Sequence, residues 1–112
     1  MTRGALGRAG EDAAVAYIAS LGFRIVARNL RGPGGEIDIV ARDGETYVFI
    51  EVKTRTSRTF GGALAAVDAR KRARIRAAAA DYLQFVAPRA YARFDVLAID
   101  GRRMHLYRGA FT

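Results

Sequence analysis

Residues 34–55, GGEIDIVARDGETYVFIEVKTR, predict two strands joined by a tight turn. Apolar residues dominate on both sides of Asp43-Gly44, and an Asp-Gly pair between two strand-like runs is a strong signal for a β-hairpin. We expect strands over residues 36–42 and 45–53. Carboxylates interrupt both strands, although acids are depleted from strand interiors, so these acids need an explanation.

The polar side chains of the hairpin are predicted to share one face, because strand side chains alternate between faces. With a turn at residues 43–44, Glu36 lies opposite Glu51, and Asp38 lies diagonal to it. Lys53 follows two residues after Glu51 on the same face. A slip of the register by two residues would keep this face and change the partners.

Such a face carries an electrostatic cost. Like charges directly opposite destabilise a sheet, and two carboxylates about 4 Å apart repel by about 4 kcal/mol at an effective dielectric near 20. A divalent cation, a raised carboxylate pKa or the Lys53 ammonium would offset this repulsion. The alternative interpretation is an ordinary polar face of an antiparallel sheet that is exposed to water.

Length and composition limit the number of domains and the kinds of metal site that this sequence can form. A length of 112 residues suits a single domain over residues 1–112. The sequence has no cysteine and one histidine, which excludes disulfides and cysteine-based or multi-histidine metal sites. Any bound metal would have oxygen ligands, and this indicates Mg²⁺, Mn²⁺ or Ca²⁺.

Charge and hydropathy indicate the kind of partner. The net charge is +8, with 17 arginines and two lysines, and a basic balance favours DNA, RNA or an anionic membrane as partner. No stretch reaches the roughly 20 apolar residues that span a bilayer. Glu11 and Asp12 directly precede the first apolar run, which is unlike a signal peptide. We therefore expect a cytoplasmic protein without a membrane partner.

The rest of the chain is predicted to add two helices and three strands to the hairpin. Apolar residues recur at helical spacing from Gly10 to about Ser20 and from about Val67 to Val86. Residues 1–9 are expected to be loosely ordered. The further strands are expected at residues 23–29, 92–99 and 104–107. The resulting order, α-β-β-β-α-β-β, predicts a mixed α/β domain.

Two parts of the hairpin resemble a nuclease motif. GEIDIV followed by FIEVKTR resembles the PD-(D/E)XK, or restriction-endonuclease-like, pattern of an acid on the second strand and Glu-x-Lys on the third. Here these positions are Asp38 and Glu51-Val52-Lys53, and Ile37 stands where the motif's name has proline. The resemblance implies an α/β fold with an α-β-β-β-α-β core, in which helices flank a mixed central sheet.

A closer resemblance covers nearly the full length. GRAGEDAAVAYIASLGFRIVARNLRGPGGEIDIVARDGETYVFIEVKTR, the FGG loop and RFDVLAI resemble the YraN family of small bacterial proteins. Within the superfamily the chain is most similar to archaeal Holliday junction resolvases. This implies a metal-dependent endonuclease that hydrolyses phosphodiester bonds of DNA, with branched or junction DNA among the expected substrates. Resolvases of this fold pair up to cut two strands, which suggests a homodimer by analogy.

The resemblance also implies roles for individual residues. Asp38 and Glu51 would bind Mg²⁺ or Mn²⁺, with the carbonyl of Val52 as a third ligand. Phosphodiester hydrolysis uses a metal to neutralise developing charge and to acidify the attacking water. Lys53 would orient that water or stabilise the pentavalent state. Glu36 would support these ligands or replace one of them.

Glu11 would complete the metal shell. Its spacing from Ala14 and Ile18 places it on the core-facing stripe of the first helix, where a carboxylate is costly unless it is paired or metal-bound. The alternative is that Glu11 only stabilises the start of the helix, where the helix dipole favours an acid.

Basic and polar side chains near the hairpin are the candidate phosphate contacts. They are Arg28, Asn29, Arg31, Arg55, Arg58, Lys71 and Arg72. Lys71 lies one turn before Ile75 near the apolar stripe of the second helix, so it is also expected to reach the acids. Two other functions are open: a binding module that holds nucleic acid or a protein without cutting, and a small RNA-binding protein.

Overall fold

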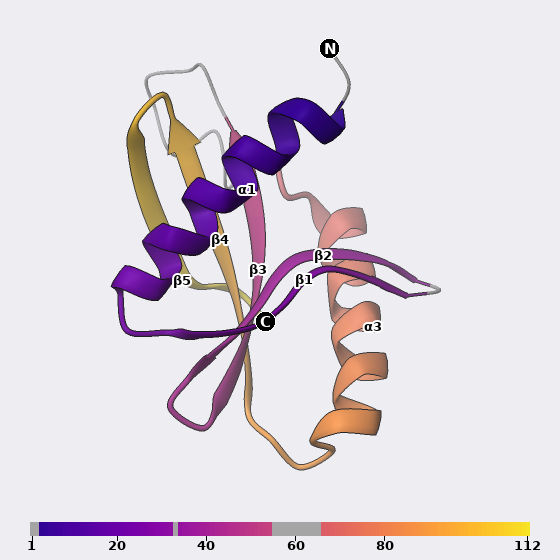
Figure 1. Cartoon of the computed structure of the whole chain (residues 1–112). Helices are drawn as coiled ribbons and strands as arrows, with labels where there is room; N and C mark the ends of the chain where they lie inside the picture. The colour runs from indigo at the N-terminus through magenta and orange to yellow at the C-terminus, as the bar shows by residue number, and fades with distance from the viewer. Residues whose placement is uncertain (1–2, 33, 55–65) are drawn as a thin grey trace.

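The chain folds in the element order that its sequence predicts. The computed structural model describes residues 3–32, 34–54 and 66–112 (Figure 1). Its elements are α1 (Arg3–Ser20), β1 (Arg24–Gly32), β2 (Gly35–Asp43), β3 (Thr46–Thr54), α3 (Ala69–Val86), β4 (Ala92–Asp100) and β5 (Arg103–Phe111). One five-stranded sheet has the order β1-β2-β3-β4-β5. β3 and β4 pair in parallel, and the other neighbouring strands pair antiparallel, so the expected mixed α/β fold is confirmed.

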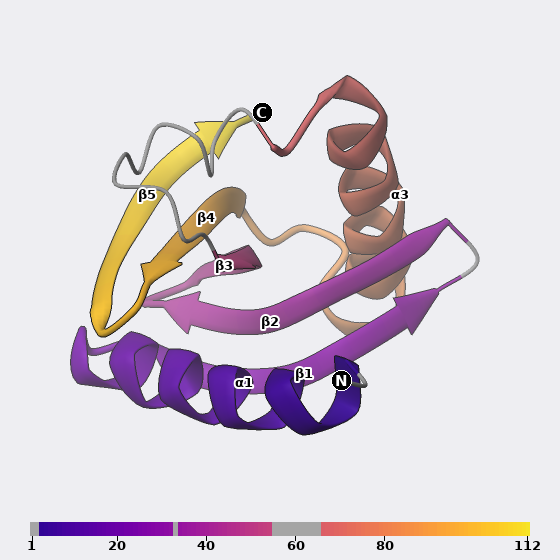
Figure 2. The same cartoon turned by 90° about the horizontal axis from the view of Figure 1, so that it is seen from above.

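The two helices of the described residues, α1 and α3, cover opposite faces of the sheet (Figure 2). Ala14 and Ile18 of α1 pack on one apolar cluster with Ile50 of β3. Ile75 of α3 packs on a second cluster with Phe49 of β3. Because neighbouring residues of β3 face different helices, this strand is buried on both sides, as strands of a parallel pair usually are.

The first helix and the outer strands are longer than predicted. α1 begins at Arg3, although residues 1–9 were expected to be loosely ordered. β1 continues to Gly32, which pairs with Gly35 of β2, although this strand was expected to end at residue 29. The glycines serve close packing in this region, because a Cβ added to Gly34 would lie 3.0 Å from the Cβ of Ala77 in α3.

The predicted register of the central hairpin is wrong by two residues. Asp43 pairs with Thr46, and Ile39 pairs with Ile50, so the loop consists of residues 44–45. Gly44 has a φ of 63°, and a two-residue hairpin loop with glycine in its first position explains the shift. The slip of two residues preserves the face of every side chain.

The corrected register changes which acids meet. Glu36 lies opposite Arg31 of β1 rather than opposite Glu51. One step beyond the last observed pair of β2 and β3, the same register brings Asp38 opposite Glu51. Within the described ranges, neither α1 nor α3 combines the length and the apolar character that a bilayer-spanning helix requires.

Candidate active site

Two carboxylates meet where β2 and β3 begin to separate. The ladder between these strands ends at Ile39 and Ile50. Directly beyond it, the backbone N–H of Val52 donates to Oδ2 of Asp38 over 2.8 Å. Asp38 is 7% exposed and Glu51 is 5% exposed. We call Asp38 and Glu51 the acid pair; it lies buried between the sheet and α3.

The environment of the acid pair favours a proton or a cation. Burial raises the pKa of Glu51 to about 8, and the hydrogen bond and negative charge of Asp38 act in the same direction. The positive charges of Lys71 and Lys53 lower this pKa. Without a bound metal ion, Glu51 therefore holds its proton at neutral pH, because two adjacent buried carboxylates do not both ionise readily.

Lys71 brings positive charge to the acid pair from α3. Its Nζ lies 3.2 Å from Oε2 of Glu51, which is ion-pair distance. The helix start that carries Lys71 is fixed by Asp68, whose carboxylate accepts from the backbone N–H of Lys71 over 2.9 Å. Capping of this kind stabilises the first turn of a helix. Lys71 was expected to reach the acids or a phosphate, and its ammonium lies beside Glu51.

The acid pair has the chemistry that a hard divalent cation requires. Oε2 of Glu51 is buried, and among the described residues no side chain or backbone group makes a hydrogen bond to it; the Lys71 ammonium contributes charge at ion-pair distance without hydrogen-bond geometry. An orphaned buried carboxylate oxygen is costly unless a ligand reaches it. Carboxylate oxygens are what Mg²⁺ and Mn²⁺ prefer, so the residues present fit such an ion.

The fit of the acid pair to a metal ion rests on its two carboxylates. In the part of the chain that the structure describes, no group of three or more His, Cys, Asp or Glu side chains could hold a metal ion. Mg²⁺ typically keeps several waters and is bound by one or two carboxylates together with substrate phosphates. Asp38 and Glu51 match that pattern.

Glu11 lies with the polar side chains of β1. Its Oε2 accepts a hydrogen bond from Nδ2 of Asn29 over 2.8 Å, and Arg28 lies 4.0 Å away. Arg28 also donates to Asp12 over 2.6 Å. Two predicted phosphate contacts, Arg28 and Asn29, therefore hold α1 against β1, and the role of Glu11 as a metal ligand stays a prediction.

The other predicted phosphate contacts differ in their surroundings. Arg31 is exposed on the edge strand β1. Arg72 donates from Nε to the carbonyl of Val67 over 2.8 Å and has its guanidinium 5.6 Å from the centre of the Phe111 ring, so it also supports the fold. Arg55 and Arg58 lie outside the described residues.

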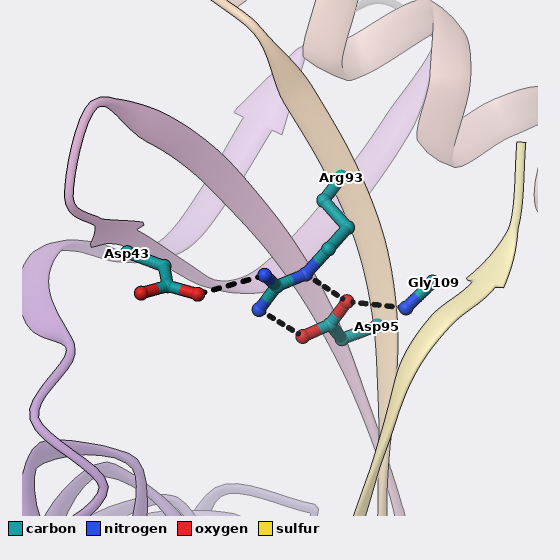
Figure 3. A network of polar contacts seen from close by, with 4 residues as sticks. All are labelled: Asp43, Arg93, Asp95 and Gly109. Atoms are coloured by element: carbon teal, nitrogen blue, oxygen red, sulfur yellow. Dashed lines mark hydrogen bonds and ion pairs between the residues drawn. The ribbon is translucent and has the colours of Figure 1, made fainter.

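A third buried acid was not singled out from the sequence. Asp95 of β4 is fully buried and accepts two hydrogen bonds from Arg93, of 2.9 and 3.0 Å (Figure 3). Gly109 of β5 donates to the same carboxylate over 3.0 Å, and Arg93 reaches Asp43 over 2.8 Å. This network raises the pKa of Arg93, chiefly through its hydrogen bond to Asp95, and ties together β2, β4 and β5.

Comparison with known proteins places the chain among many bacterial relatives. The sequence model of the "Uncharacterised protein family UPF0102" matches residues 10–99, which include the acid pair. A UPF0102 protein of Moorella thermoacetica is 54% identical over 101 residues, which are 88% of this chain and 83% of the relative. A UPF0102 protein of Shewanella loihica is 48% identical over 105 residues, which are 94% of this chain and 92% of the relative. A UPF0102 protein of Methylibium petroleiphilum is 47% identical over an alignment of 118 residues, which covers 99% of this chain and 97% of the relative.

Proposed function

Because this chain belongs to the uncharacterised family UPF0102, which is the YraN family, we propose its function from its own site: metal-dependent hydrolysis of phosphodiester bonds in DNA. The acid pair carries this proposal. It combines two adjacent buried carboxylates, an orphaned oxygen on Glu51 and nearby ammonium groups. The net charge of +8 supports a polyanionic substrate.

In this proposal Asp38 and Glu51 hold Mg²⁺ or Mn²⁺, with the carbonyl of Val52 as a further ligand. Such an ion polarises the phosphate and lowers the pKa of bound water. The main-chain hydrogen bond from Val52 fixes the carboxylate of Asp38. Lys53 orients the attacking water or stabilises charge on the phosphate, and Lys71 provides a second positive charge beside Glu51.

The proposal extends to the substrate and the assembly. Branched or junction DNA is the substrate that we propose, and two copies of the chain would act together to cut its two strands. A DNA substrate in a bacterial cell implies a cytoplasmic location. Light scattering with and without a four-way junction measures the number of copies, and a single copy on the junction argues against paired cleavage.

One observation favours a second function, a binding module that does not cut. The ammonium of Lys71 lies 3.2 Å from Glu51, so the chain itself supplies a positive charge beside the acid pair. Charge balance at the acid pair then needs only this ammonium and the proton on Glu51. The module would hold nucleic acid through its basic surface, and Asp38→Asn would leave its affinity unchanged in EDTA.

The test is cleavage of labelled four-way junction, flap, single-stranded and duplex DNA with Mg²⁺ or Mn²⁺. The wild type is compared with Asp38→Asn and Lys53→Met. Glu45→Gln is the matched control, because Glu45 is an exposed acid in the loop of the same hairpin. We expect cleavage that requires metal, is lost in both site variants and persists in the control. Binding without cleavage under either metal would instead establish the binding module.

A further inference from the structure

A hollow lies where β1 begins and β2 ends, away from the acid pair. This hollow of about 250 Å³ is lined by Arg24, Ile25, Val26, Arg42 and Tyr47, and we call it the arginine pocket. Arg24 of β1 and Arg42 of β2 stand directly opposite each other in the ladder. Two arginines therefore line the same hollow, without an acid among its lining residues.

This arrangement is unfavourable in the isolated chain. Like charges directly opposite each other destabilise a sheet. Nε of Arg42 is also buried, and within the described part of the chain it has no hydrogen-bond partner. Its guanidinium lies 5.4 Å from the centre of the Tyr47 ring. This contact supplies no hydrogen-bond acceptor in the plane of the guanidinium group.

No acid of the chain compensates the pair. All eleven acidic residues lie in the described ranges. Among those residues, no hydrogen bond or ion pair joins an acid to Arg24 or Arg42. Arg93, by contrast, is paired with both Asp43 and Asp95. The arginine pocket thus concentrates positive charge that the fold leaves unneutralised.

The backbone is irregular beside the pocket. The register between β1 and β2 shifts between Ile25 and Ala27, so Val26 is an extra residue that has no partner across the ladder. Bulges of this kind re-aim neighbouring side chains and are frequent next to functional sites. Here the bulge comes one pair after the Arg24–Arg42 pair, and Val26 belongs to the lining of the hollow.

We propose that the arginine pocket binds a phosphate group between Arg24 and Arg42. Guanidinium groups present planar forks of donors that match phosphate oxygens. An anion there would supply the acceptor that Nε of Arg42 lacks and would convert a repulsive pair into two attractive contacts. The phosphate belongs either to a nucleic-acid backbone or to a small free molecule.

The position suits a backbone phosphate. Arg42 follows Asp38 by four residues on β2, which is about 13 Å along a strand, and side chains four residues apart share a face. DNA carries a charge about every 1.7 Å of its axis, so nucleic acid that reaches the acid pair has further phosphates within that distance. The inference does not depend on cleavage at the acid pair.

The test compares wild type, Arg24→Gln and Arg102→Gln. Arg102 is an exposed arginine of the β4–β5 loop, so the control carries the same change in charge. Thermal unfolding is followed in chloride buffer and with added inorganic phosphate at constant ionic strength. Without phosphate, Arg24→Gln is expected to unfold at a higher temperature than the wild type, because the repulsion is gone. Phosphate is expected to raise the Tm of wild type and control by a few degrees and to leave Arg24→Gln unchanged.

A second arm measures binding of a short DNA duplex as a function of salt. If the pocket takes a backbone phosphate, Arg24→Gln weakens binding and reduces the slope of log K against log salt by about 1. A phosphate-dependent Tm with an unchanged slope identifies a small free phosphate instead. If Arg24→Gln behaves like Arg102→Gln in both arms, the pocket is not a phosphate site. Neither arm measures cleavage, so a failure of the nuclease proposal is seen separately.

Discussion

Glu51→Gln tests the electrostatics of the acid pair most directly. Burial and Asp38 raise the pKa of Glu51 from 4.5 to about 8, and glutamine resembles the neutral, protonated form. Since the pKa in the folded state is the higher one, the Glu51 proton stabilises the fold fully below pH 4.5. That stability is lost progressively as the pH rises from 4.5 to about 8, so the wild type should weaken over this range while Glu51→Gln does not.

The size of the effect follows from the rise in pKa. A rise from 4.5 to about 8, at about 1.4 kcal/mol for each pH unit, corresponds to about 5 kcal/mol once Glu51 is fully ionised. Between pH 5 and pH 8.5 the difference in unfolding free energy between Glu51→Gln and wild type should grow by up to about 4 kcal/mol. A domain of this kind has a total stability of about 5–15 kcal/mol, so the change is easily measured.

Urea unfolding in EDTA at pH 5, 7 and 8.5 is the assay, with Glu45→Gln as the control. The midpoint difference should widen by more than about 1 M urea for Glu51→Gln and stay constant for the control. Mg²⁺ at pH 8.5 should then stabilise the wild type and leave Glu51→Gln unaffected. A difference that is independent of pH would refute the reasoning, because Glu51 would then ionise in the fold as it does in water.

Three further substitutions test other contacts. Lys71→Met removes a positive charge that lowers the pKa of Glu51, so carboxyl ¹³C titration should show this pKa rising above its wild-type value. Arg93→Ala leaves the buried carboxylate of Asp95 without its cation and should cost about 3–5 kcal/mol in urea unfolding, with Arg93→Lys recovering part of it. Gly35→Ala should cost about 1–3 kcal/mol, because Gly35 has a φ of 157° and its new Cβ would lie 3.1 Å from that of Arg74; an unchanged Tm would contradict this.

The two-residue periodicity of strands predicted the face on which the acid pair lies, but it could not predict the register of the hairpin. A two-residue repeat places Asp38, Glu51 and Lys53 on one side in any register that differs by two residues. The register depends on which residues form the loop, and that depends on the positive φ of Gly44. An Asp-Gly pair is compatible with either loop, so the local sequence could not choose between them.

Contacts between distant segments were the least predictable. Arg93 and Asp95 are two residues apart on one strand, a spacing that already indicated a shared face. Their third partner, Asp43, is 50 residues away from Arg93, and no local pattern connects the two. Glu11 shows the same limit, since helical spacing identified its stripe but not Asn29 as the group that it contacts.

The parallel pairing of β3 with β4 determines the order in which parts of the site come together during synthesis. Asp38 and the amide of Val52 are 14 residues apart and come together in a local hairpin, which forms within microseconds. Lys71 emerges from the ribosome later, and β4 later still, after the crossover through α3. A nascent chain therefore brings Asp38 and Glu51 together with the positive charge of Lys53 beside them, before Lys71 adds a second one.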